Sequence, residues 1–447
     1  MISMFTKIRA NNYKSLVDFD VDLTKKSNET KPLIIVYGEN GVGKSNFSNL
    51  FLTLCESLNT FRSRMQITRF MTDHFDEYDK MMSDEKLKNF LKTNFKDTES
   101  IIETSKTIDS TENMVLDFEF VVNNNRGRYL IEYDDVELVH ERLEYVLNKN
   151  KVVFYDFEED NNFINKKIFI DENYFSDFTE LFYKYKGKHS FLSTLEFDIE
   201  DKARGYVKER ITPKLYSLLK TFKMMSVRVK SGAHMDMGSV GVKYEMLTDL
   251  REGTISKNKE NEILKIQKML NYLFTTTYED IKSVYYKTNE MEEKIHYKLF
   301  VRKKLYGKLV DIDFQQESTG TQKLLEILPP LLMCMEGETV IIDEIDSGIH
   351  DLLILKLLLS LEKSINGQMI ITTHSTMLLD SGINPEGIYV FNIEDDGKKT
   401  LLPISHFENR LHPNLNYRNR YLKGIYGGIP KIDEFDFKKV KSILDES

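Results

Sequence analysis

The feature that most constrains this chain is a glycine-rich turn, residues 38–46, that joins an apolar run to an amphipathic pattern. The apolar run, residues 34–37, is typical of a buried strand, and the spacing of apolar residues over 47–58 is typical of a helix. The turn fits G-x-x-x-x-G-K-[ST] without a departure. Because this pattern binds phosphate when a strand precedes it and a helix follows it, we interpret the turn as a phosphate loop.

Each residue type in this loop suits a nucleoside triphosphate bound together with Mg²⁺. Glycines let backbone N–H groups converge on phosphate oxygens, and the helix N-terminus adds a partial positive charge. We expect Lys44 to reach the β- and γ-phosphates and the Ser45 hydroxyl to ligate Mg²⁺. The expected nucleotide-binding residues of the loop are Gly38, Asn40, Gly41, Gly43, Lys44, Ser45 and Asn46.

Composition excludes several other classes of protein. The chain has 447 residues, enough for two or three structural units, and its net charge of −9 argues against a protein that coats nucleic acid over its whole surface. Cys55 and Cys334 are too few for a disulfide framework or a thiolate zinc site, which predicts a reducing, cytoplasmic location. We expect no membrane association, because the N-terminus lacks an apolar signal core and the longest apolar runs cannot span a bilayer.

The order of strand and helix patterns predicts an α/β fold with two lobes. Residues 1–160 combine the phosphate loop with strand patterns that predict an antiparallel β subdomain, and residues 64–112 within them look polar and peripheral. Residues 161–290 carry mostly helical patterns and predict an inserted helical arm. Residues 291–406 alternate strands with helices, which predicts a second lobe with a parallel sheet, and residues 407–447 form a C-terminal tail.

Two carboxylates follow the buried strand pattern of residues 339–342. We expect Asp343, at the end of that strand, to hold Mg²⁺, and Glu344, which points elsewhere, to polarise the attacking water. His374 follows a later strand pattern, residues 368–372, and is a candidate to hydrogen-bond the γ-phosphate or that water. A lone histidine at a strand end is more often structural, but the other motifs in the chain favour the catalytic interpretation.

A second anion-binding candidate lies upstream of these carboxylates. Ser318 and Gly320 open a predicted helix, and a helix N-terminus with small polar residues can hold an anion. An ordinary N-cap is the alternative interpretation of the same residues. The other motifs of the chain favour the anion site.

The order of these motifs resembles that of the ABC-type ATPases of the SMC/RecF/OLD branch. The loop G-E-N-G-V-G-K-S, the signature E-S-T-G, the apolar strand ending in D-E and the segment T-T-H-S occur in that order. The segment N-Y-K-S at residues 12–15 resembles the N-F-K-S motif of the same branch. Residues 317–430 are similar to the RloA and AbiL group of prokaryotic AAA-15 and AAA-21 ATPases, through D-E-I-D-S-G-I-H and R-Y-L-K-G-I-Y-G-G-I-P. The resemblance does not identify residues 64–290.

This resemblance implies an ABC-type P-loop nucleotide-binding domain that hydrolyses ATP with Mg²⁺. It assigns Lys14 to nucleotide binding and a D-loop to residues 346–348. It also implies a head-to-head homodimer, or a higher oligomer, in which Ser318 and Gly320 of one subunit complete the ATP site of the other. The signature differs from the transporter L-S-G-G-Q, and no Q-loop is placed, because Gln66 does not end a strand pattern.

The resemblance further implies the sensor or switch subunit of an anti-phage, abortive-infection-like system with a separate effector, such as a TOPRIM or RloB-like nuclease. The alternative is a RecF- or SMC-like DNA-repair ATPase that clamps DNA, which requires a basic groove. The best local patch, residues 302–304 with Lys308, is small and more typical of a solvated strand edge than of a DNA-binding groove. A self-contained OLD-type nuclease is rejected, because the stretch after His374 is too short for a further metal-binding domain.

The tail contains a segment rich in aromatic and basic residues, 417–430. One interpretation is a helix and turn that pack back on the core, with Tyr421, Leu422 and Ile425 buried. The other is a docking surface for the effector or a second subunit, because tyrosine and arginine are enriched where interfaces concentrate binding energy. The sequence leaves both interpretations open.

Overall fold

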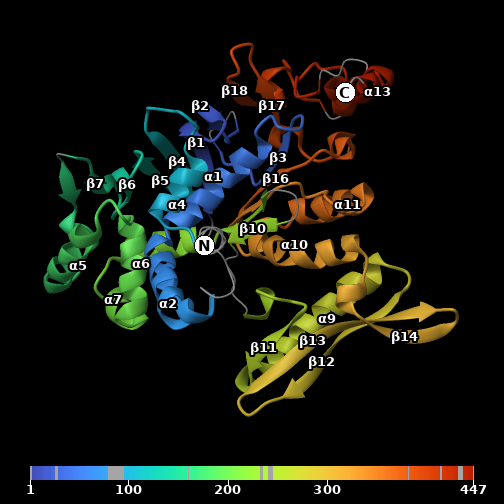
Figure 1. Cartoon of the computed structure of the whole chain (residues 1–447), viewed down its shortest axis with the longest axis horizontal. Helices are drawn as coiled ribbons and strands as arrows, with labels where there is room; N and C mark the ends of the chain where they lie inside the picture. Colours follow the sequence, from blue (N-terminus) through green and yellow to red (C-terminus); the bar gives the residue numbers. More distant parts are fainter. Residues whose placement is uncertain are drawn as a thin grey trace.

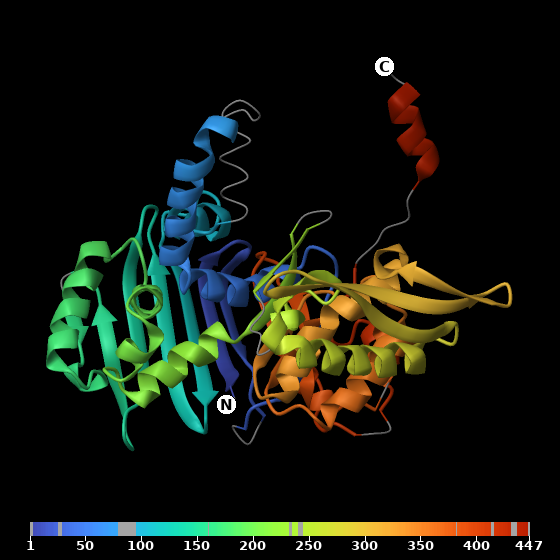
Figure 2. The same ribbon diagram turned by 90° about the horizontal axis from the view of Figure 1, so that it is seen from below.

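Three β-sheets organise the part of the chain that the computed structural model describes (Figure 1). An antiparallel sheet lies on one side of a central sheet, and a smaller arm lies on the other side (Figure 2). The structure describes residues 3–25, 29–78, 95–159, 161–231, 235–239, 245–380, 382–412, 415–430 and 436–445.

The central sheet carries the phosphate loop. Its order is β10-β9-β15-β16-β3-β17-β18; the strands from β9 to β17 are parallel, and the two edge strands are antiparallel. Parallel strands are buried on both faces, which explains the unbroken apolar runs of the inner ones and confirms the predicted parallel sheet. The strands are β3 (Leu33–Tyr37), β9 (Ser226–Ser231), β10 (Met235–Ser239), β15 (Thr339–Ile342), β16 (Gln368–Thr372), β17 (Ile388–Ile393) and β18 (Lys399–Pro403).

Alternate residues of the central strands enter two hydrophobic cores, one on each face. Ile34 and Val36 of β3 join the core of α1 and the antiparallel sheet, whereas Ile35 and Tyr37 join the core of α10 and α11. Side chains of successive strand residues point to opposite faces, so β3, β15, β16 and β17 each join both cores. These helices are α1 (Lys44–Ser57), α10 (Thr319–Met335) and α11 (Asp351–Glu362).

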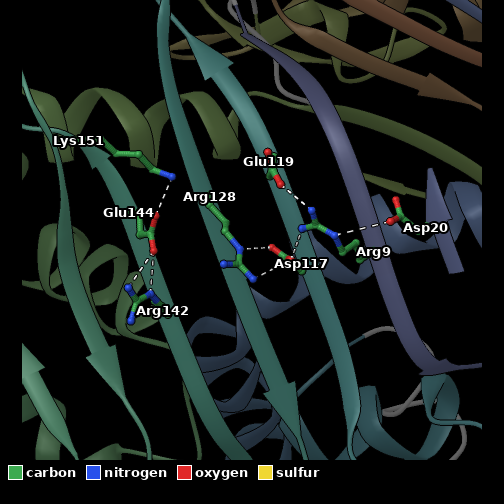
Figure 3. A network of polar contacts seen from close by, with 8 residues as sticks. All are labelled: Arg9, Asp20, Asp117, Glu119, Arg128, Arg142, Glu144 and Lys151. Atoms are coloured by element: carbon green, nitrogen blue, oxygen red, sulfur yellow. Dashed lines mark hydrogen bonds and ion pairs between the residues drawn. The ribbon is translucent and has the colours of Figure 1, made fainter. Parts of the chain in front are cut away.

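The antiparallel sheet, in the order β2-β1-β4-β5-β6-β7-β8, confirms the predicted β subdomain. One face packs apolar side chains against α1 and the helices of residues 172–223, and polar side chains from neighbouring strands form an ion-pair ladder (Figure 3). In this ladder Asp117 accepts hydrogen bonds from Arg9 at 2.7 Å and Arg128 at 2.8 Å. The strands are β1 (Ser3–Tyr13), β2 (Leu16–Asp22), β4 (Met114–Val122), β5 (Asn125–Tyr133), β6 (Leu138–Val146), β7 (Lys151–Phe157) and β8 (Asn162–Ile164).

The expected helical arm, residues 161–290, is instead a mixture of helices and strands. Strand β9 pairs with β15 inside the central sheet. Its Ser, Arg and Lys residues do not form the apolar pattern that predicts a buried strand. The arm itself is a four-stranded sheet covered by α9 (Glu260–Thr277), whose Ile263, Ile266 and Leu270 are buried as the helical spacing predicts. Its strands are β11 (Glu252–Ser256), β12 (Ile281–Glu290), β13 (Lys294–Leu305) and β14 (Lys308–Asp313).

Most of the remaining helices flank these sheets, but the helix of residues 437–445 extends away from them (Figure 2). In the segment predicted to be peripheral, Ile101 and Ile102 of α4 are buried, and residues 79–94 lie outside the described part of the chain. Of the described helices, none is both long and apolar enough to cross a membrane. They are α2 (Thr60–Tyr78), α4 (Thr98–Ser105), α5 (Glu172–Tyr185), α6 (Phe191–Asp201), α7 (Arg204–Lys208), α8 (Pro213–Lys223), α12 (Tyr417–Leu422) and α13 (Phe437–Asp445).

Candidate nucleotide-binding site

The phosphate loop connects β3 to α1, as the sequence predicts. Gly43 precedes the first helical residue with φ +125°, a conformation that side-chain-bearing residues rarely adopt. Lys44 is 6% exposed, and its Nζ donates to Gly38 O at 2.8 Å and to Glu39 O at 2.9 Å. Burial lowers the pKa of Lys44, although nearby carboxylates raise it. The ammonium therefore rests on loop carbonyls in a site where a phosphate would compensate its charge.

Asp343 and Ser45 form a group of oxygens that suits a divalent cation. Asp343 follows β15, and its Oδ1 accepts a hydrogen bond from Thr372 Oγ1 at 2.5 Å. Burial raises the pKa of Asp343, and hydrogen bonds from Thr372 and Ser45 oppose that shift. Its Oδ2 is buried and has no hydrogen-bond partner among the described residues. An unsatisfied carboxylate oxygen beside a hydroxyl fits Mg²⁺, which prefers oxygen ligands.

Glu344 is held in a strained backbone conformation directly after Asp343. Its φ is +47°, in the left-handed region, and its N–H donates to Thr372 Oγ1 at 2.8 Å. Its carboxylate accepts a hydrogen bond from Lys230 Nζ at 2.7 Å and lies 4.0 Å from His374 Nε2. Burial raises the pKa of Glu344, but Lys230 and the other nearby cations outweigh it, and the net shift is downward. Glu344 is thus an ionised carboxylate at the edge of the site.

His374 follows β16 and lies beside the same carboxylates. Its backbone N–H donates to Asp346 Oδ2 at 3.2 Å, and its side chain is 39% exposed. Burial and the charge of Lys44 lower the pKa of His374, so the imidazole is neutral at pH 7. A neutral ring has one donor and one acceptor nitrogen, which suits contact with a phosphate oxygen or a water.

Lys230 is a site residue that sequence reasoning missed. It lies near the end of β9, the strand that pairs with β15 on the side away from β16. Its Nζ also donates to Ser347 Oγ at 2.5 Å, so it joins Glu344 to the predicted D-loop. No local pattern marks this lysine, because its position depends on strand order in the sheet. Gln66 lies in α2 and ends no strand, which agrees with its rejection as a Q-loop.

The signature residues begin α10 and contact the predicted D-loop. Ser318 caps the helix, because its Oγ accepts a hydrogen bond from Thr321 N at 3.2 Å. A Cβ on Gly320 would lie 2.7 Å from Gly348 O, so the glycine permits close packing on the D-loop. Within the described residues, neither Ser318 nor Gly320 hydrogen-bonds the phosphate loop. The N-cap interpretation therefore holds within one chain, and the anion-site assignment stays a prediction for an assembled dimer.

Lys14 does not join the other expected residues. Burial lowers the pKa of Lys14, and its ammonium interacts with Lys96 and with Glu56, which lies near the end of α1 that is away from the phosphate loop. The neighbouring Ser15 reaches the loop instead, where its Oγ accepts a hydrogen bond from Asn46 Nδ2 at 2.6 Å. The turn between β1 and β2 is strained, with Lys14 at φ +49°, and it directs Ser15 rather than Lys14 toward the phosphate loop.

One family model matches this chain, and several solved structures are similar to it. Residues 33–380 match a family model described as "AAA domain, putative AbiEii toxin, Type IV TA system". The solved structures that resemble the chain include an SmcHead bound to the C-winged helix domain of ScpA (TM-score 0.44, 11% identity, covering 89% of this chain and 97% of that one). They also include RecF with ATP (TM-score 0.38, 12% identity, 90% and 99%) and an Smc head from Pyrococcus yayanosii (TM-score 0.42, 10% identity, 94% and 99%). No curated protein matches the chain.

Proposed function

The chain belongs to this AAA family, whose model matches most of its length, and from that premise we propose that it binds ATP with Mg²⁺ and hydrolyses it. The observation that carries the proposal is the convergence of Lys44, Ser45 and Asp343, with an unpartnered carboxylate oxygen between two strand ends. A bound phosphate would give Lys44 a charged partner in place of the loop carbonyls, and a cation would satisfy the free oxygen of Asp343.

The proposed mechanism gives each of these side chains one step. Lys44 leaves the carbonyls of Gly38 and Glu39 and pairs with the phosphates. Ser45 and Asp343 would hold Mg²⁺, which would neutralise charge on the phosphates when bound. Once the hydrogen bond from Lys230 to Glu344 breaks, the Glu344 carboxylate orients the attacking water and accepts its proton. His374 hydrogen-bonds the γ-phosphate or the water.

The phosphate-loop assignment is tested with Lys44→Ala. Loss of the main cation should abolish measurable ATP binding in calorimetry, because the β- and γ-phosphate charge has no replacement partner. The melting temperature without nucleotide should stay near that of the parent, since Lys44 bonds only to loop carbonyls. ATP binding at the parental affinity would refute the assignment.

The role of Glu344 is tested with Glu344→Gln, which keeps the size of the side chain and removes its charge. We expect ATP binding close to that of the parent and turnover reduced by about a hundredfold or more, the range of a lost general base. Single-turnover hydrolysis separates this outcome from slow product release. Parental turnover would exclude Glu344 as the base.

We also propose that two such chains form a head-to-head dimer that acts as the switch of an anti-phage system and controls a separate effector. Type IV toxin–antitoxin systems are named in the family description, which supports a defence role. The RecF- or SMC-like alternative needs an unpaired basic groove, yet Arg302 pairs with Asp311 at 2.7 Å and Lys303 pairs with Glu317 at 2.8 Å. This pairing favours the switch over the DNA clamp. Co-purification of a nuclease with the tagged chain from its native cells tests the effector.

A further inference from the structure

Lys399 is a basic side chain that lies on the phosphate loop although no motif includes it. It comes from β18, the edge strand beyond β17. Its Nζ donates to Ser15 Oγ at 2.7 Å and to Gly41 O at 3.3 Å. A Cβ on Gly43 would lie 3.3 Å from Lys399 Cδ and 3.7 Å from its Nζ. The ammonium therefore bridges the turn after β1 and the middle of the loop.

The charge of Lys399 has only neutral partners in the described part of the chain. Its hydrogen-bond acceptors are a hydroxyl and a carbonyl, and burial lowers its pKa. Lys44 likewise hydrogen-bonds only to carbonyls. The neighbouring Lys398, in contrast, forms an ion pair with Asp18 at 2.5 Å on the exposed surface. A half-buried ammonium without a carboxylate beside a phosphate loop is arranged to receive an anion.

The two lysines serve different parts of the loop. Lys44 Nζ lies at the first two residues of the loop and interacts electrostatically with Asp343, Glu344 and Asp346, where the terminal phosphate and the cation belong. Lys399 shares Ser15 with Asn46, the residue after the predicted Mg²⁺ ligand Ser45. Among the described residues, no carboxylate of the Asp343 group pairs with Lys399, whose ammonium contacts Ser15 and the middle of the loop at Gly41 instead.

We propose that Lys399 is a second phosphate-binding residue, which holds the part of the nucleotide that ATP and ADP share. It supplies the cation that the sequence resemblance assigned to Lys14, whose ammonium interacts with Glu56 instead. The inference rests on the proposed ATP site. It adds a contact from β18, at the edge of the central sheet, to the phosphate loop that follows β3.

The test compares Lys399→Gln, Lys399→Arg and the control Lys398→Gln in the full-length chain. Calorimetry with ATP and with ADP, each with Mg²⁺, gives the affinities, and steady-state hydrolysis gives KM and kcat. Lys399→Gln should weaken both nucleotides by the same factor, about tenfold, the value of one charge-assisted hydrogen bond. KM should rise by that factor while kcat changes little. Lys399→Arg should retain most of the affinity, and Lys398→Gln all of it.

Two results would overturn the inference: parental ADP affinity in Lys399→Gln, whether or not ATP affinity falls, or an equal loss of affinity in Lys398→Gln. Melting temperatures of the three variants test whether they fold alike. If Lys399→Gln destabilises β18, Lys399→Arg still tests the role of the charge, because arginine keeps it. A parent chain that binds neither nucleotide would refute the proposed function itself. That result differs from a loss seen only in variants, so the two failures are distinguishable.

Discussion

At the scale of single residues, this protein buries ionisable groups both inside and outside its site. Asp343 and Lys44 are buried where bound ligands would compensate their charges. Glu141 of β6 is instead buried among hydrogen-bond donors of the protein itself. Glu141 is 2% exposed; its Oε1 accepts from Tyr129 and Tyr155, and its Oε2 accepts from Phe191 N at 2.7 Å. Burial nevertheless raises the pKa of Glu141 to about 7. This group should therefore make stability depend on pH.

The direction in which stability changes with pH follows from the raised pKa of Glu141. The folded chain holds the proton of Glu141 more tightly than the unfolded chain, so its contribution is complete below about pH 4.5 and is lost as pH rises through 7. Relative to Glu141→Gln, the parent should lose on the order of 3 kcal/mol of stability between pH 5 and pH 8. Melting temperatures of both proteins across this range measure the difference.

Glu144 on the same strand is the matched control. Burial raises the pKa of Glu144, but Lys151 and Arg142 lower it by more than burial raises it. The net shift of this pKa is therefore downward. Its titration therefore lies below pH 5, and Glu144→Gln should differ from the parent by a constant amount between pH 5 and pH 8. A constant difference for Glu141→Gln as well would contradict the buried-acid account.

At the scale of elements, the C-terminal tail supports the phosphate loop. Tyr417, Tyr421 and Tyr426 are buried, the ring of Tyr421 packs 5.6 Å from that of Tyr37, and its hydroxyl donates to Gly428 O at 2.8 Å. This packing favours the core interpretation of residues 417–430. Leu422 and Ile425, expected to be buried, are 55% and 41% exposed, because the helix is short and only its tyrosine face meets the core.

Gly428 provides the element-scale prediction. It has φ +65°, and an added Cβ would lie 2.4 Å from Val390 Cγ1, 2.9 Å from Phe391 O and 3.5 Å from Gly38 Cα. Gly428→Ala should therefore push on β17, whose Phe391 packs against the first glycine of the loop, and should lower both the melting temperature and the ATP affinity. Gly424→Ala, at φ +73°, meets only the flexible end of Ile429 and should cost about 1 kcal/mol from backbone strain alone. Equal ATP affinities in the two variants would show that the tail does not support the loop.

At the scale of the whole molecule, the arm is tied to the signature. Lys303 of β13 pairs with Glu317 at 2.8 Å and with Asp280 at 2.8 Å, and Glu317 directly precedes the helix cap Ser318. The signature packs in turn on the D-loop through Gly320. An event at the arm can therefore reach the candidate ATP site through residues that touch one another, provided that the signature faces a nucleotide on a second chain.

Mixing two inactive variants tests that arrangement. Lys44→Ala keeps its signature and loses its loop, and Ser318→Arg keeps its loop and loses its signature. Each mixed dimer then contains one working site, so an equal mixture with free exchange should regain about a quarter of the parental ATPase activity. Ser318→Arg alone should still bind ATP, after a cost of about 1 kcal/mol for the lost cap. No recovery at any ratio would indicate a site built within one chain.

The sequence by itself determined the parts of this protein that depend on neighbouring residues. The strand, the glycine turn and the helix of residues 33–57 form as expected, as do β15 with its two carboxylates and β16 with His374. Such motifs can be predicted because their geometry depends on backbone conformation over a few residues. The antiparallel subdomain was predictable for the same reason, through its alternating apolar residues and its turns.

Only the tertiary structure decided which distant residues meet at the site. Lys230 reaches Glu344 because β9 pairs with β15, and Lys399 reaches Ser15 because β18 closes the edge of the central sheet. Strand order is set by the packing of the whole core, and no local pattern records it. The same cause explains the error in residues 161–290: β9 has a polar sequence, and its burial comes from neighbours far away in the chain.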